Sequence, residues 1–145
     1  MRKGYWMRSL AAGIALCTGA AVANSPAALP VAGAIGQIEP GQWQLREAGS
    51  AAPPRLICVA NPDRLIQIEH AGLTCARTLL SDQPRTATIS YSCPGAGHGR
   101  TMIRIETRNS FHLETQGIAG GAPFDMAFEA KRMGDCAAAS LKAGR

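Results

Sequence analysis

The second half of the chain contains four consecutive segments in which apolar and polar residues alternate with a period of two. In residues 86–93, apolar side chains occupy every second position, and Ser or Thr fills the positions between them. Residues 101–107, 111–116 and 124–129 repeat this alternation, and turn-forming residues separate the segments. A period of two is typical of a β-strand with one buried and one solvated face. The pattern therefore predicts a meander of antiparallel hairpins.

Three further segments before this meander also have strand character, namely residues 42–46, 55–60 and 74–80. With them the chain has about seven strands and short turns between most of them, which is typical of an all-antiparallel domain. We therefore predict a mainly β fold, either an antiparallel curled sheet or a small barrel-like meander, with one short helix and two disulfides. The predicted inward stripe consists of Trp43, Ile89, Tyr91, Ile103, Ile105, Phe111, Phe124 and Phe128.

The one helix of this domain is predicted directly after the second strand. Asn61 is a favourable N-cap residue, and Pro62 suits the first helical position. Gly72 is expected to end the helix after about two turns. His70 falls near this end, where a cation interacts favourably with the helix dipole.

The N-terminal residues have the three parts of a secretory signal peptide. Arg2, Lys3 and Arg8 form a positive start, residues 9–23 are small and apolar, and this run ends in Ala-Val-Ala. This order of features predicts cleavage after Ala23. A membrane anchor would need about 20 strongly apolar residues, and this run is shorter. The predicted organisation is a signal peptide over 1–23, a flexible leader over 24–36, a β domain over 37–136 and a disordered or short helical tail over 137–145.

Cleavage would remove three of the 15 Lys and Arg residues and leave 12, against 10 Asp and Glu. The mature chain would then carry a charge of only about +2, without a dense basic cluster of the kind that grips nucleic acid. We therefore expect no nucleic-acid partner, and contact with a membrane only through the signal peptide before it is cleaved.

Four cysteines remain after cleavage, because Cys17 lies in the signal peptide. Four Cys in a small exported domain predict two disulfides, and the alternative of a zinc site needs pairs that are closer in sequence. Three pairings are possible. A hairpin turn at residues 82–84 places Cys75 directly opposite Cys93, at a spacing that suits a disulfide. The remaining bridge would then join Cys58 to Cys136.

Several of these features occur together in one known group of proteins. The chain has a Pro-Gly-Gln-Trp opening at 40–43, Cys58 at the end of the second strand, Cys75, Cys93 and an Arg-Met-Gly-Asp-Cys ending at 132–136. With its signal peptide pattern, it resembles the small exported bacterial proteins grouped as domain of unknown function 3617, over about residues 38–136. The resemblance implies a bacterial envelope location and a β-rich domain. It also implies structural roles for Trp43, Gly134 and the four Cys. It implies no activity and no catalytic residues.

Three residues are candidates for ligand binding. The Gly-rich segment 94–99 is predicted to be a long hairpin connection, and there His98 and Arg100 could offer backbone N–H groups and a cation to an anion. The alternative is a connection without a binding role. Tyr91 is the third candidate, since the inward stripe of a strongly curled sheet can leave room for a small apolar ligand.

The sequence does not predict a catalytic centre, a metal site or a cofactor. His70, His98 and His112 lack the spacing of metal ligands, and His112 is expected on a solvated strand face beside Glu114. No Gly-x-Ser-x-Gly nucleophile elbow occurs, and the mature Cys are expected to be oxidised. The sequence leaves open whether the protein is an enzyme, and it favours a non-enzymatic binding or maintenance protein of the periplasm or cell exterior.

Its partner would be an envelope protein or a small ligand. The two alternative hypotheses are a small secreted hydrolase that uses His98 with a nearby acid, and an inhibitor that presents residues 94–100 to an envelope enzyme.

Overall fold

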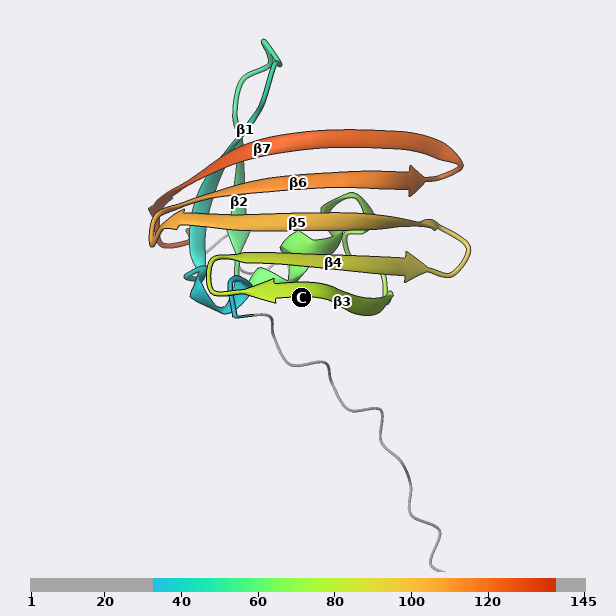
Figure 1. Cartoon of the computed structure of the whole chain (residues 1–145). Helices are drawn as coiled ribbons and strands as arrows, with labels where there is room; N and C mark the ends of the chain where they lie inside the picture. Colours follow the sequence, from blue (N-terminus) through green and yellow to red (C-terminus); the bar gives the residue numbers. More distant parts are fainter. Residues whose placement is uncertain (1–32, 138–145) are drawn as a thin grey trace, which may run out of the picture.

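The computed structural model describes residues 33–137 (Figure 1). The predicted signal peptide, most of the predicted leader and nearly all of the predicted tail lie outside the described residues. Seven antiparallel strands form one sheet in the order β2-β1-β7-β6-β5-β4-β3. The strands are β1 (Gly41–Glu47), β2 (Arg55–Val59), β3 (Ala76–Gln83), β4 (Thr86–Cys93), β5 (Gly97–Thr107), β6 (Ser110–Ala119) and β7 (Ala122–Gly134).

The predicted meander is confirmed, because β3 to β7 pair in chain order through hairpins. β1 then adds to the sheet beside β7, and β2 pairs with the other side of β1. β2 and β3 remain as edge strands, so the sheet is open. Of the two predicted architectures, the structure therefore has the curled sheet and not a closed barrel.

The main helix, η2 (Pro62–His70), is a 3-10 helix with a kink at Gln67. It begins as predicted, because the side chain of Asn61 accepts a hydrogen bond from the Asp63 N–H at 2.9 Å. η2 contacts β2 as well as β4 and β5, which lie far from β2 in the strand order. The sheet therefore curls around η2. We call the face toward η2 the concave face and the opposite one the convex face. Within residues 33–137, no helix has the length and apolar character needed to cross a membrane.

The concave face forms the core and contains the predicted inward stripe. Of its eight residues, Phe124 alone is only partly buried, and the other seven are buried. Leu65 and Ile66 of η2 pack into the same cluster. The predicted leader extends too far, because Ala34 and Ile35 are also buried in this core, at the short helix η1 (Ile35–Gln37). Their apolar side chains fill space beside the sheet.

Both predicted disulfides are present. Cys75 and Cys93 have a Cα–Cα distance of 4.3 Å across the β3–β4 hairpin, and Cys58 and Cys136 have one of 5.5 Å. The first bridge follows from register, since Ala76 pairs with Ser92 in the adjacent position of the ladder. Two such bridges fit a secreted or extracytoplasmic protein.

Candidate functional site

A row of polar side chains crosses the convex face over four adjacent strands. Ser90 of β4 pairs with Arg100 of β5, Arg100 with Gln116 of β6, and Gln116 with Asp125 of β7. In a β-sheet, residues aligned in this way present their side chains on the same face. Arg100, Gln116 and Asp125 are exposed and Ser90 is partly exposed, so the row faces solvent.

This row lies along an open groove of about 540 Å³. His98, two positions before Arg100 on β5, lines the groove with the row, and Gly99 and Gly117 lie between them. A second groove adjoins it, sharing Arg100, Gln116 and Asp125 and extending the hollow toward Glu114. The structure therefore places two of the three sequence candidates, His98 and Arg100, side by side on one face.

The third candidate, Tyr91, does not belong to this groove. Its side chain lies on the concave face and is only 3% exposed. Its hydroxyl lies 3.2 Å from Nδ1 of His70. Burial raises the pKa of Tyr91, a hydrogen bond with Thr115 opposes this effect, and the charge of Glu69 adds to it. Because the concave space around Tyr91 is filled, its position does not support the prediction that it binds a ligand.

The environment of His70 also differs from the expected one. The imidazole is buried, and its Nε2 lies 3.3 Å from the carbonyl oxygen of Ala96. A carbonyl only accepts, so Nε2 carries a hydrogen, and in the neutral imidazole Nδ1 then accepts from the hydroxyl of Tyr91. His70 therefore links η2 to the β4–β5 turn and is buried, whereas the sequence predicted an exposed position at the end of the helix. Asn61 and Pro62 predicted only the start of the helix, and the start of a helix gives no information about what the side chain of His70 contacts.

The predicted long connection over 94–99 is instead a tight turn, because β5 already begins at Gly97. His98 pairs with Ser92 on one side and with Ile118 on the other. Close packing requires a glycine at position 99, since a Cβ there would lie 2.5 Å from Oη of Tyr91. The long loop on which the anion-binding and inhibitor hypotheses depended is therefore not present, while the side chains of His98 and Arg100 remain accessible.

The histidine that has a carboxylate partner is His112. Its Nε2 lies 2.9 Å from Oε1 of Glu106, which also lies 3.6 Å from Nη1 of Arg104. As predicted, His112 lies on the same strand face as Glu114, which is two positions further along β6, and it also contacts Glu106 of the neighbouring strand β5. His98 has no carboxylate partner among the ion pairs of residues 33–137. In that same part of the chain, no three His, Cys, Asp or Glu side chains are grouped to hold a metal ion.

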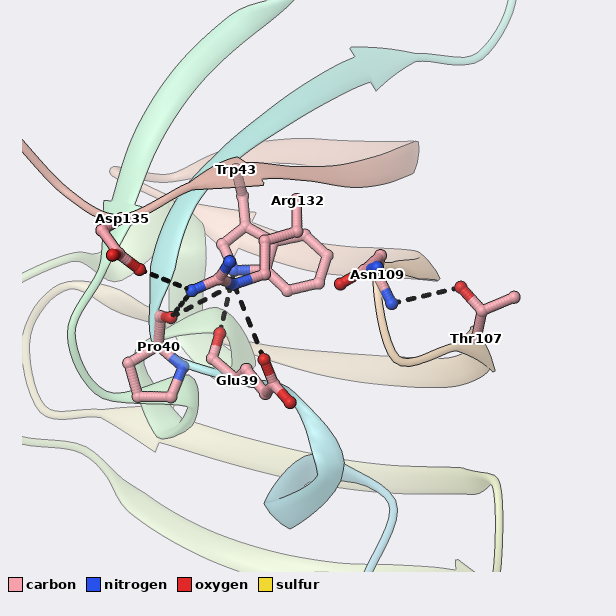
Figure 2. A network of polar contacts seen from close by, with 7 residues as sticks. All are labelled: Glu39, Pro40, Trp43, Thr107, Asn109, Arg132 and Asp135. Carbon is pink, nitrogen blue, oxygen red and sulfur yellow. Dashed lines mark hydrogen bonds and ion pairs between the residues drawn. The ribbon is translucent and has the colours of Figure 1, made fainter.

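Arg132 joins the two ends of the β domain, as Figure 2 shows. Its guanidinium donates to the carbonyl oxygen of Pro40 at 2.9 Å and to the carboxylate of Asp135 at 2.9 Å. The indole of Trp43 donates to the carbonyl oxygen of Glu39 at 3.1 Å. These contacts bring together the two sequence motifs on which the family resemblance depends. Their geometry stabilises the fold and leaves the convex groove as the candidate functional site.

Comparison with known proteins finds no matching family model, no matching curated protein and no matching solved structure. The resemblance to domain of unknown function 3617 therefore stays a prediction.

Proposed function

We propose that this chain is an exported binding protein of the bacterial envelope, without catalytic activity, that holds a ligand or partner in the groove of His98 and Arg100. The signal peptide pattern and the two disulfides support export into an oxidising compartment. The periplasm or the cell exterior is the proposed location, and membership of the domain of unknown function 3617 family is part of the same proposal.

One observation carries the proposed binding role. Arg100 belongs to a row of hydrogen-bonding side chains, and it has no ion-pair partner among residues 33–137. Arg132 and Arg77, in contrast, contact carboxylates and lie at structural junctions. The concave face is closed to a ligand by its buried side chains, so the exposed groove is the better binding surface.

Mass spectrometry of the protein purified without denaturation from its own cell envelope tests the export part of this proposal. We expect a polypeptide that begins at Asn24 and contains both disulfides. A chain that begins at Met1 and whose thiols are all alkylated without prior reduction would contradict export.

The same native measurement tests the groove. We expect the wild-type protein to retain an additional mass, and Arg100→Gln to lose it. Arg64→Gln is the matched control, because Arg64 is an exposed arginine of η2 outside the groove. A retained mass that persists in Arg100→Gln, or no retained mass in any form, would contradict binding in this groove.

A further inference from the structure

We propose that the convex groove recognises a zwitterionic ligand whose phosphate group binds at Arg100 and whose primary ammonium group binds at Asp125. This inference rests on the proposed function, since it assigns a ligand class to the same groove. It follows from the way in which opposite charges are separated along the groove.

Arg100 and Asp125 lie in the same row, with Gln116 of β6 between them. Adjacent strands are about 4.8 Å apart, so their Cα atoms are separated by about 9.6 Å. Neither side chain has an ion-pair partner among the described residues, although both line the same groove. A pair of opposite charges held apart in this way is complementary to a ligand that carries the reverse pair.

This separation is not general on the convex face. Nearer the other end of β5, Arg104 and His112 both contact the carboxylate of Glu106, and the positive charge of Arg104 offsets it. The charges of that cluster already interact with one another, whereas those of the Arg100 row do not. A charged ligand therefore competes with fewer internal contacts at the Arg100 row.

The end of the groove at β4 and β5 contains donors suited to a phosphate. Arg100 offers a planar fork of N–H groups, and His98, Ser90 and the amide of Gln116 can each donate a further hydrogen bond. A phosphate monoester has three strongly accepting oxygens, so it can use more of these donors than a carboxylate can. Among the described residues, Asp125 is the only acidic one that lines this groove, and it lies at the opposite end.

The end at β6 and β7 is suited to an ammonium group. The carboxylate of Asp125 accepts N–H donors, and Glu114 adds a second negative charge in the adjoining groove. Ile118 also lines the groove and gives an apolar surface for the carbon atoms that join the two charged groups. The groove volume of about 540 Å³ is ample for a compact ligand of this kind.

Isothermal titration calorimetry with O-phosphoethanolamine as the probe tests this assignment on the mature protein. We expect saturable binding that is about tenfold tighter than that of inorganic phosphate or ethanolamine alone, because both charged ends then contribute. Arg100→Gln should abolish binding of both phosphate compounds. Asp125→Asn should bind O-phosphoethanolamine only as tightly as inorganic phosphate, and its affinity for inorganic phosphate should equal that of the wild type. Arg64→Gln should behave as wild type.

A vesicle sedimentation experiment distinguishes a lipid headgroup from a free small molecule as the ligand. If the group belongs to a lipid, the protein should sediment with phosphatidylcholine vesicles that contain phosphatidylethanolamine, but not with pure phosphatidylcholine, whose ammonium has no N–H. If the ligand is a free molecule, calorimetry should be positive and neither vesicle should sediment the protein.

The assignment is overturned if O-phosphoethanolamine shows no saturable binding in either arm, or if Asp125→Asn leaves its preference over phosphate unchanged. If an Arg100-dependent mass is retained by the native protein while these probes fail, the ligand class is wrong and the proposed function stands. If retention does not depend on Arg100, the proposed function itself fails.

Discussion

Replacing Gly99 by alanine should destabilise the protein, and removing the tip of the Tyr91 ring should reverse the sign of this effect. A Cβ at position 99 would lie 2.5 Å from Oη, 2.6 Å from Cζ and 2.8 Å from Cε1 of Tyr91. Real Cβ atoms do not make contacts this short, so the ring would have to move. Because Tyr91 is buried and hydrogen-bonded to His70, this movement disturbs both packing and a polar contact.

The cost can be built from these two effects. Overpacking a well-packed core costs about 1–3 kcal/mol. Loss of the hydrogen bond between Tyr91 and His70 adds about 1 kcal/mol. We therefore expect Gly99→Ala to lower the free energy of unfolding by about 2–4 kcal/mol, measured by urea denaturation of the oxidised protein.

The Tyr91→Leu background separates the steric effect of the ring from the low strand propensity of alanine. Leucine lacks the three ring atoms that the new methyl group would meet. The backbone at Gly99 is not in the left-handed region, so alanine fits it without strain. In this background Gly99→Ala should raise the free energy of unfolding by about 0.4–1 kcal/mol, because alanine restricts the unfolded chain.

Gly117→Ala is the matched control. A Cβ at this position meets the backbone carbonyl oxygen of His98, which no side-chain change at Tyr91 removes. It should therefore destabilise both backgrounds to a similar extent. If Gly99→Ala destabilises the Tyr91→Leu protein as strongly as the wild type, the close approach of the tyrosine ring is not the reason for the glycine.

Opening the Cys58–Cys136 bridge by a double alanine substitution should lower the free energy of unfolding by about 4.5 kcal/mol in the chain-entropy model, given the sequence separation of 78, and an unchanged urea midpoint would contradict this. The free energy of unfolding should fall above about pH 10, because burial raises the pKa of Tyr91 and its hydroxyl therefore loses the proton at a lower pH in the unfolded chain than in the folded one. Tyr91→Phe should make this fall less steep, and an equally steep fall in the variant would exclude Tyr91 as its cause. Arg132→Met should cost about 1–2 kcal/mol in thermal or urea unfolding, because it removes the charged donor to the carbonyl of Pro40, and a loss no larger than at an exposed arginine would show that this junction contributes little.

Much of the fold could be predicted because it depends on contacts between neighbours in the sequence. The alternation in residues 86–93 matches β4 at both ends, and a turn near Pro84 set the register that joins Cys75 to Cys93. The pairing of Cys58 with Cys136 then followed by elimination, without any knowledge of where β1 and β2 lie.

The candidate site was predicted in part. His98 and Arg100 were found from their residue types, but for the wrong structural reason, since they lie on a strand and not in a loop. Glycines at 97 and 99 indicated flexibility, whereas Gly97 accommodates the backbone of Ile118 and the His70 ring, and Gly99 accommodates the Tyr91 ring. A glycine required by close packing and a glycine in a mobile loop look the same in a single sequence.

By itself, the sequence determined the strand alternation, the hairpin order and both disulfide pairings, because these follow from local periodicity and turn positions. Only the tertiary structure decided that the sheet curls around η2, that Tyr91 faces His70, and that Ser90, Arg100, Gln116 and Asp125 form one row. The first two depend on contacts between residues far apart in the sequence, about which local periodicity carries no information. The row also depends on a β-bulge near the β5–β6 turn, which shifts the pairing of these strands by one residue, so the turn position alone does not give their register.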